Sequence, residues 1–173
     1  DMLTKMGANI SGAGTSEIII EGVERLKPTN HEVIGDRVAA GTFLAAIFST
    51  RGSGKVIGIN PEHLPMEIKK FKEMGAIIDL KEDSISIEYD EGINSIELAT
   101  LPFPGVATDL QPIFGSALLQ AEGTSILTEN VYDQRFQWIP EVQRMGANIQ
   151  TGWQHAMIKG CLLYTSPSPR DSL

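Results

Sequence analysis

A repeat of about 70 residues is the feature that most restricts how this sequence can fold. The tripeptide Met-Gly-Ala begins at Met6, Met74 and Met145, and each copy follows a helix-like segment and precedes extended, β-branched sequence. A glycine just past the last helical residue accepts the left-handed conformation that ends many helices. The repeat therefore predicts that a helix ends at each copy and that the chain then turns into a strand.

The residues around these copies predict a repeated unit with the order helix, strand, helix, hairpin. The predicted hairpins cover residues 8–20, 76–88 and 147–158. The predicted single strands are residues 55–59 and 125–128, and an Ala-rich apolar helix precedes each, at residues 36–49 and 109–120. Both apolar helices are hydrophobic nearly all round, which predicts burial on every side. Residues 89–107 connect the two units, and the whole pattern predicts an α/β fold.

Composition excludes several classes of protein. The 173 residues include 14 Lys and Arg against 22 Asp and Glu, so the net charge is −8, which argues against nucleic acid or an anionic membrane as a partner. With 42% hydrophobic and 21% charged residues, the chain has the balance of a globular protein with a core. No stretch approaches the roughly 18–20 apolar residues of a membrane helix, and the first residues lack a signal-peptide pattern. We therefore expect a cytoplasmic protein.

Cysteine, histidine and glycine give no sign of a metal or cofactor site. The single cysteine, Cys161, cannot form an internal disulfide, and the three histidines have no metal-ligand spacing with one another or with carboxylates. Residues 51–56 and 12–15 are rich in glycine but lack the complete motifs of nucleotide-binding loops, so both predict turns. We expect no metal and no cofactor.

Both ends of the sequence depart from the pattern. The first residues start in the middle of a helical pattern without a capping residue, so we expect an internal fragment. From Cys161 the periodicity is lost, and the residues through Asp171 back-translate without a gap into a string that resembles a transposase-type sequencing adapter. An ordinary tail rich in serine and proline is the alternative. We expect residues 161–173 to be non-native and exclude them from functional reasoning.

Two aspartates stand at the starts of the apolar helices. Asp36 and Asp109 lie at or beside the predicted N-caps, and capping alone explains such residues about as often as not. Two helices that start at equivalent places of a repeat also direct their free N–H groups and positive dipole ends toward one region, which attracts phosphate or carboxylate. An aspartate held there is a candidate general base if a substrate hydroxyl comes within hydrogen-bond reach.

A polar and aromatic segment, residues 129–136, follows the strand predicted at 125–128. On composition alone it is typical of a solvated loop. It leaves the same edge of the sheet as the helix start at Asp109, however, and its Arg135 has the planar fork that binds phosphate or carboxylate. Arg135 is therefore a second candidate site residue.

Several segments carry a resemblance to a known family. They are Glu21-Gly22-Val23-Glu24-Arg25-Leu26, Asp36-Arg37 with Gly41-Thr42-Phe43-Leu44, Thr108-Asp109-Leu110-Gln111, Glu129-Asn130-Val131-Tyr132-Asp133-Gln134-Arg135-Phe136, and Pro140-Glu141 with Arg144-Met145-Gly146-Ala147. In this order they resemble the UDP-N-acetylglucosamine 1-carboxyvinyltransferase family of enolpyruvyl transferases, over residues 1 to about 160.

The resemblance implies a fold, a reaction and domain boundaries. The family has two inside-out α/β barrels, each built of three repeated strand and helix units, so this chain is expected to hold an incomplete set. It moves the enolpyruvyl group of phosphoenolpyruvate to the 3-hydroxyl of UDP-N-acetylglucosamine for peptidoglycan synthesis, through a tetrahedral intermediate. Residues 1–34 then end a first domain, residues 35–160 form part of a second, and residues 161–173 are the adapter-like tail.

The same resemblance implies roles for individual residues. Asp109 corresponds to the carboxylate that takes the proton of the sugar hydroxyl and contacts the sugar. Val131 corresponds to a residue whose backbone holds the sugar, Arg135 to a cleft arginine that faces anionic groups, and Asp36 to a carboxylate near phosphoenolpyruvate. Phe103 stands where many relatives carry histidine. The family's loop cysteine lies outside this sequence, and Cys161 does not correspond to it.

Two alternatives remain open beside this hypothesis. The sister reaction, 3-phosphoshikimate 1-carboxyvinyl transfer, shares the fold and the chemistry, although the segment at residues 129–136 disfavours it. A non-catalytic repeat scaffold is the other alternative. Under the main hypothesis the substrates are the partners, the isolated 173-residue chain is expected to be inactive, and the sequence leaves the oligomeric state open.

Overall fold

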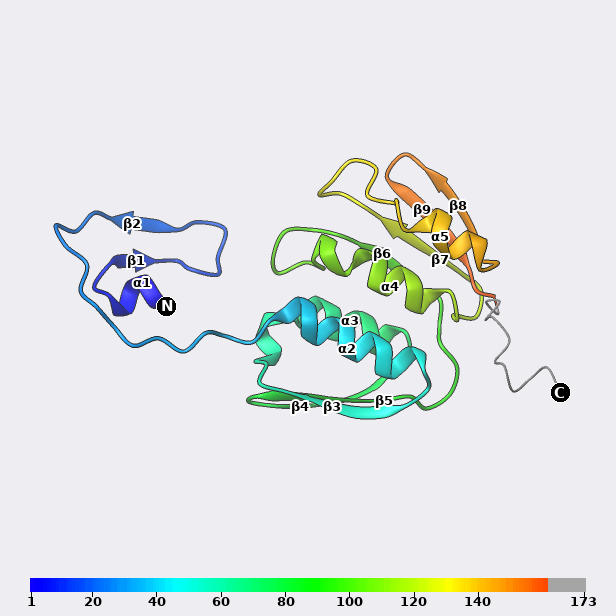
Figure 1. Cartoon of the computed structure of the whole chain (residues 1–173), viewed down its shortest axis with the longest axis horizontal. Helices are drawn as coiled ribbons and strands as arrows, with labels where there is room; N and C mark the ends of the chain where they lie inside the picture. The colour runs from blue at the N-terminus through cyan, green and yellow to red at the C-terminus, as the bar shows by residue number, and fades with distance from the viewer. Residues whose placement is uncertain (162–173) are drawn as a thin grey trace. The chain divides into compact units, whose positions relative to one another are not determined.

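A computed structural model describes residues 1–161 of the chain (Figure 1). The chain divides into two compact units, one of residues 1–34 and one that begins at Gly35. Of the tail that the sequence predicts to be non-native, only Cys161 falls within the described residues; its main-chain N–H donates to the carbonyl oxygen of Leu119 at 2.8 Å.

The first unit is a short helix followed by a hairpin. Helix α1 (Met2–Lys5) ends before Gly7, whose φ is +97°. Strands β1 (Asn9–Ser11) and β2 (Ile19–Glu21) then pair antiparallel. The hairpin predicted at residues 8–20 is thus confirmed, and the unit closes with a hydrogen bond from the N–H of Lys27 to the carbonyl of Met6.

The second unit contains two copies of the predicted helix, strand, helix, hairpin order. The first copy comprises α2 (Arg37–Ser49), β3 (Ser53–Ile57), the 3-10 turn η1 (Pro61–His63), α3 (Pro65–Glu73), β4 (Ile77–Lys81) and β5 (Ser84–Glu88). The second comprises the 3-10 turn η2 (Thr108–Leu110), α4 (Gln111–Leu118), β7 (Thr124–Thr128), α5 (Ile139–Arg144), β8 (Asn148–Gly152) and β9 (His155–Lys159). Gly75 and Gly146 end α3 and α5 with φ values of +101° and +96°, as the repeat predicts.

The described strands of the second unit form two sheets. One has the order β3-β5-β4 and is antiparallel throughout. The other has the order β6-β7-β9-β8, in which β6 (Glu97–Ala99) pairs parallel with β7. The sequence pattern missed β6, which lies in the segment that we expected to be only a connection.

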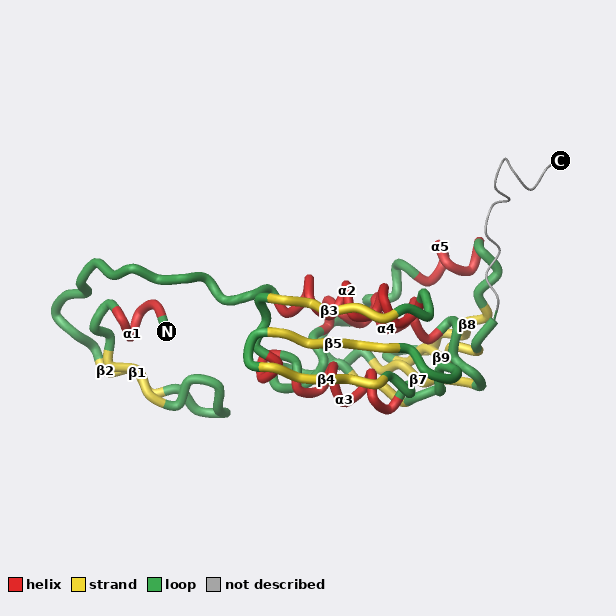
Figure 2. Tube along the Cα trace, turned by 90° about the horizontal axis from the view of Figure 1, so that it is seen from below, coloured by secondary structure: helices red, strands yellow, loops and turns green. Residues whose placement is uncertain are grey.

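Helices α2, α3 and α4 lie between the two sheets (Figures 1 and 2). Helix α2 contacts β3 and β5, α4 contacts β7 and β9, and α2 and α4 contact each other. Phenyl rings join the three central helices: Phe71 of α3 lies 4.7 Å from Phe114 of α4 and 6.3 Å from Phe48 of α2, centroid to centroid. All three side chains are fully buried, and each such burial contributes about 1.5–3 kcal/mol. Sheets outside and helices inside make the inside-out arrangement that the resemblance implied.

Three sequence predictions need correction. The expected burial of α2 on every side is wrong, because Phe43 exposes 63% of its surface and no described element covers it. Gly54 and Lys55 lie within strand β3, not in a turn. The helix expected from residue 109 starts with the 3-10 turn η2, because Pro112 sits in the first turn of α4 and the chain tightens before it.

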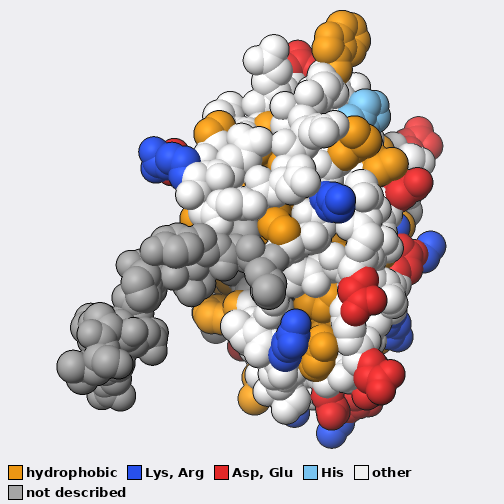
Figure 3. All heavy atoms as spheres, turned by 90° about the vertical axis from the view of Figure 1, so that its right-hand side faces the viewer, with side chains coloured by type: hydrophobic (Ala, Val, Ile, Leu, Met, Phe, Trp, Pro, Cys, Tyr) orange, Lys and Arg blue, Asp and Glu red, His pale blue; other side chains and the backbone are white. Residues whose placement is uncertain are grey.

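The surface is mixed in character. On the face of the second unit in Figure 3, acidic side chains gather toward the end of the three-stranded sheet, while Lys and Arg side chains stand apart from one another. No helix in the described part of the chain has the length and apolarity to cross a membrane.

Candidate functional site

The candidate site lies where several chain segments meet at one end of the second unit. Helices α2 and α4 start at the same end, and the loop of residues 129–138 leaves β7 there (Figure 1). Because β6 and β7 are parallel, their carboxyl ends also lie together at this edge. Thr100, just after β6, thereby comes within contact of residues from η2 and the loop, and the loop also contacts α4.

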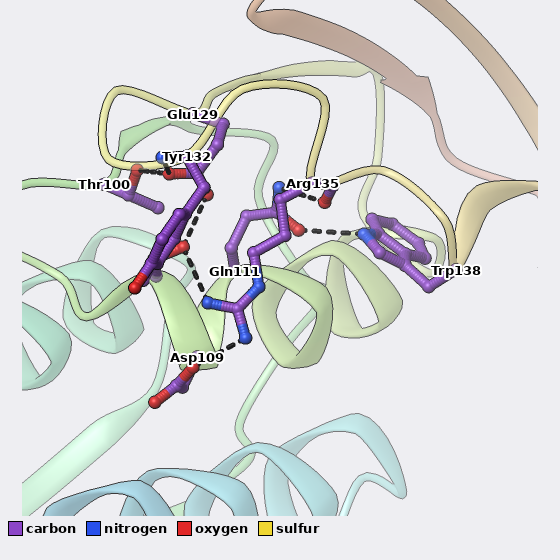
Figure 4. A network of polar contacts seen from close by, with 8 residues as sticks. Thr100, Asp109, Gln111, Glu129, Tyr132, Arg135 and Trp138 are labelled. Carbon is purple, nitrogen blue, oxygen red and sulfur yellow. Dashed lines mark hydrogen bonds and ion pairs between the residues drawn. The ribbon is translucent and has the colours of Figure 1, made fainter.

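Glu129 is the buried centre of this end of the unit (Figure 4). Its side chain is fully buried. The first carboxylate oxygen, Oε1, accepts from the Thr100 hydroxyl at 2.7 Å and from the N–H groups of Val131 and Tyr132 at 2.9 and 3.1 Å. The second, Oε2, accepts from the Thr108 hydroxyl at 2.9 Å. One carboxylate therefore ties the loop to Thr100, the residue that follows β6, and to η2.

These hydrogen bonds set the charge state of Glu129. Burial acts to raise the pKa of its carboxyl, but the hydrogen bonds from Thr100, Val131, Thr108 and Tyr132 together outweigh that effect and lower the pKa below its ordinary value. The ionised form is the one that can accept from all four donors. Glu129 is accordingly an anion that fixes the backbone of the 129–138 loop through hydrogen bonds.

Arg135 and Asp109 are linked to Glu129 through Thr108. The Thr108 hydroxyl accepts from Nη1 of Arg135 at 3.1 Å while it donates to Glu129. Nη2 of Arg135 donates to Oδ1 of Asp109 at 2.6 Å, which makes an ion pair. The guanidinium also lies over the ring of Tyr132, 5.4 Å from its centroid. The orientation of Arg135 is thus fixed by three neighbours.

A second set of contacts holds the backbone of Arg135. Gln111 at the start of α4 is fully buried, and its Nε2 donates to the carbonyl of Arg135 at 3.0 Å. Nε1 of Trp138 donates to Oε1 of Gln111 at 2.8 Å. The indole covers Gly115, where an added Cβ would lie 2.4 Å from the ring, so the glycine is required for this packing.

The ion pair borders a hollow of about 470 Å³. Its lining comprises Thr108, Asp109, Tyr132, Asp133, Arg135 and Gln137. The side chain of Asp109 is 57% exposed, against 33% for that of Arg135. A carboxylate that is oriented by a guanidinium and open to solvent can take a proton from a ligand hydroxyl, and the guanidinium can bind an anionic group beside it.

The structure brings together some of the predicted site residues and not others. Asp109 and Arg135 form the ion pair. Val131 stands on the same loop, with its N–H committed to Glu129, which leaves its carbonyl for a ligand. Asp36 does not line the hollow; its Oδ1 accepts from the N–H groups of Val38 and Ala39 at the start of α2. Capping therefore holds for Asp36 and is wrong for Asp109, which caps no helix.

Sequence reasoning missed Glu129, Thr100 and Gln111 as parts of the site. The available signal was position: Glu129 follows the last residue of a buried strand, where a carboxylate needs partners. Thr100 had no such signal because β6 itself was missed.

A second buried carboxyl, that of Glu67, contacts the residue before η2. Glu67 of α3 is fully buried, and its Oε1 accepts from the N–H of Ala107 at 3.2 Å. Burial raises the pKa of this carboxyl, against the opposing effects of backbone hydrogen bonds and of the Arg37 charge. Its Oε2 has no hydrogen-bond partner among the described residues. Arg37 in turn lies over Phe103, 5.5 Å from the ring centroid.

Within residues 1–161, no group of three or more His, Cys, Asp or Glu side chains is placed to hold a metal ion. The chemistry open to the site is therefore argued from Asp109, Arg135 and the hydrogen-bonding groups around them.

Comparison with known proteins places these residues in a family. Residues 1–169 match the model of the EPSP synthase (3-phosphoshikimate 1-carboxyvinyltransferase) family. The chain is 44% identical over 160 residues to the UDP-N-acetylglucosamine 1-carboxyvinyltransferase of Nocardia farcinica, and 41% identical to those of Corynebacterium jeikeium and Thermotoga maritima. Each alignment covers 92% of this chain and 38% of the relative, so the chain spans about two fifths of the length of these proteins.

Solved structures agree on the fold. The enolpyruvyl transferase NikO from Streptomyces tendae superposes with a TM-score of 0.78 at 23% identity, over 91% of this chain and 38% of that one. An EPSP synthase from Acinetobacter baumannii gives 0.71 at 23% identity, over 92% and 39%. By sequence and by fold, the chain belongs to the enolpyruvyl transferase family described as EPSP synthase (3-phosphoshikimate 1-carboxyvinyltransferase).

Proposed function

We propose that this chain is a segment of an enzyme that transfers the enolpyruvyl group of phosphoenolpyruvate to the 3-hydroxyl of UDP-N-acetylglucosamine. The observation that carries the proposal is the Asp109–Arg135 ion pair, open to a hollow and held through Thr108 by the buried Glu129. The names of the relatives that are 41–44% identical support the choice of reaction.

In the proposed reaction Asp109 is the general base. Its carboxylate takes the proton of the acceptor hydroxyl as the hydroxyl oxygen bonds to C2 of phosphoenolpyruvate, while a general acid from the rest of the enzyme protonates C3 and the C2–C3 double bond becomes single. The tetrahedral intermediate then loses phosphate from C2 and a proton from C3, which forms the double bond again. Arg135 orients Asp109 and offsets negative charge on the substrates. The carbonyl of Val131 is free to accept from the sugar, and Asp36 would act near phosphoenolpyruvate.

The sister reaction on shikimate 3-phosphate is the second candidate, because the matching family model carries that name. The identities favour the first candidate: two solved EPSP synthase structures are 23% and 18% identical to this chain, well below the 44% of the relative from Nocardia farcinica. A non-catalytic scaffold has less support, because it gives no reason to hold an exposed carboxylate against an arginine.

The wider role follows from the reaction. An enzyme that makes this product supplies peptidoglycan synthesis, and through the cell wall it supports cell shape, division and the cell cycle. We propose a cytoplasmic location, since both substrates are small anionic metabolites of the cell interior.

The isolated 173-residue chain is expected to be inactive. Its described residues place one arginine in the hollow, which leaves the anionic phosphates of both substrates without enough cationic partners. Mixed with phosphoenolpyruvate and UDP-N-acetylglucosamine, it should release no phosphate above the blank. Grafting residues 1–160 into the Nocardia farcinica enzyme, in place of the matching segment, should restore release.

The host enzyme and the host without the segment are the controls for this graft. Phosphate release by the isolated chain would overturn the expectation of an incomplete site. A folded graft that binds both substrates and releases no phosphate would contradict the proposed function.

A further inference from the structure

Trp153 occupies a position that the fold does not explain. Gly152 pairs with His155, so Trp153 and Gln154 form the two-residue turn between β8 and β9. Trp153 has a φ of +52° and exposes 92% of its surface. Turns of this length favour glycine or asparagine where φ is positive, and an exposed indole adds nothing to the core. A left-handed backbone at a bulky residue costs free energy, and such positions cluster at functional sites, so Trp153 is a candidate for a role outside folding.

The indole stands between two hollows. The larger, about 320 Å³, is lined by Asp133, Gln134, Trp153 and Gln154. The other, about 290 Å³, is lined by Gln134, Phe136, Thr151, Gly152 and Trp153. Gln134 also has a positive φ, +57°. Two of the non-glycine residues with left-handed backbone therefore line the same pair of hollows.

The base of these hollows is firmly attached to the rest of the unit. The N–H of Glu129 donates to the carbonyl of Gln154 at 2.8 Å, so the residue that holds the 129–138 loop also holds the hairpin turn. Oγ1 of Thr128 and Nδ1 of His155 lie 2.9 Å apart where the two strands meet the turn. These hydrogen bonds hold the backbone of the hairpin turn that carries Trp153 and Gln154.

Asp133 gives the edge of the larger hollow a negative charge that no neighbouring cation offsets among the described residues. Within residues 1–161, the carboxylate of Asp133 has no ion-pair or hydrogen-bond partner, whereas Arg135 beside it is paired with Asp109 and Thr108. A bare carboxylate beside a free indole face attracts a cation, since the face of tryptophan is the best aromatic partner for one.

We propose that Trp153 and Asp133 bind an arginine side chain of a partner protein. A guanidinium stacks flat on an aromatic face while its edge donates to a carboxylate, which an ammonium group cannot do. The amide oxygens of Gln134 and Gln154 are further acceptors. A neutral sugar ring, the other ligand typical of tryptophan, leaves the Asp133 charge without a counterion. The chain's net charge of −8 favours the approach of a basic partner. Asp133 also lines the hollow beside the Asp109–Arg135 ion pair, whereas Trp153 does not, so the proposed arginine site adjoins the site of enolpyruvyl transfer and shares Asp133 with it.

The test uses the two tryptophans of the intact chain. The ¹⁵N-labelled 173-residue protein gives two indole N–H signals, one from the exposed Trp153 and one from Trp138, which donates to Gln111; W153F assigns them. Titration with the peptide acetyl-Gly-Arg-Gly-amide should shift the Trp153 signal in a saturable way and leave that of Trp138 in place. The citrulline peptide, a neutral isostere, and the lysine peptide should bind more weakly.

The variant D133N should raise the dissociation constant of the arginine peptide by roughly two- to fivefold, the range for loss of an exposed ion pair. D79N, a change of another exposed aspartate on β4, should leave the affinity unchanged. Equal binding of the arginine and citrulline peptides, or no saturable shift of Trp153, would overturn the proposal. So would saturation by N-acetylglucosamine in place of arginine, which would assign the hollow to a sugar.

Discussion

Replacing Asp109 by asparagine in the grafted full-length enzyme is expected to lower turnover by on the order of a hundredfold or more, with acceptor binding largely retained. Asparagine keeps a side-chain oxygen that can accept from Nη2 of Arg135, so the geometry of the pair survives. It cannot take a proton from a hydroxyl. The change therefore removes the proposed chemistry and spares the architecture.

The readout for D109N is the pair kcat and KM for UDP-N-acetylglucosamine, with D79N as the control for loss of one negative charge. A fall in kcat with little change in KM indicates an interaction made in the transition state. Turnover equal to that of D79N would remove Asp109 from the mechanism. A rise in KM alone would assign it to binding.

Replacing Glu129 by glutamine is expected to lower the free energy of unfolding of the 173-residue chain by about 2 kcal/mol at pH 7. The amide group that replaces one oxygen is a donor, and it faces hydroxyl or N–H donors on whichever side it lies. A buried donor left without an acceptor costs its full desolvation. Urea unfolding followed by the fluorescence of the partly buried Trp138 measures the loss.

The pH dependence of E129Q provides a sharper check. Because the pKa of Glu129 is lowered on folding, its stabilising effect is complete above the unfolded-state value of about 4.3 and is lost as pH falls through the folded value. The gap in stability between wild type and E129Q should therefore narrow on acidification from pH 6 to below 4.

E67Q is the matched control, because Glu67 is equally buried but its pKa is raised. Its contribution to stability is complete below about 4.3 and is lost as pH rises through the folded value. E67Q should therefore gain stability relative to wild type as pH rises, the opposite trend to E129Q. A parallel pH response of the two variants would contradict the opposite pKa shifts of these two carboxyls.

Much of the fold could be predicted from sequence because its signals are local. A helix that ends in glycine and is followed by β-branched residues can be recognised without knowledge of tertiary contacts. The hairpins predicted after Gly7, Gly75 and Gly146 are confirmed. Strand β6 was missed because its three residues exist as a strand only through pairing with β7. The exposure of Phe43 on α2 could not be predicted either, because an apolar helix pattern does not show which element packs against each face of the helix.

The site could be predicted in part. Asp109 stands at a predicted helix start, and Arg135 stands in the polar segment that follows a predicted strand. Their positions, their residue types and the resemblance made both of them candidate site residues. Glu129 belongs to the same segment but was not singled out, because its importance depends on burial and on donors from Thr100 after β6, from η2 and from its own loop. Such long-range convergence is visible only once the chain is folded.

Hydrogen exchange on the grafted full-length enzyme tests the central claim most directly, because it reports on the residues of this chain. UDP-N-acetylglucosamine should slow the exchange of amides in residues 108–110 and 130–136, around Asp109 and Arg135, while shikimate 3-phosphate at the same concentration should not. Residues 77–88, the hairpin of the other sheet, should be unaffected by either acceptor. Protection by shikimate 3-phosphate instead, or by neither acceptor, would contradict the assignment of this site to UDP-N-acetylglucosamine.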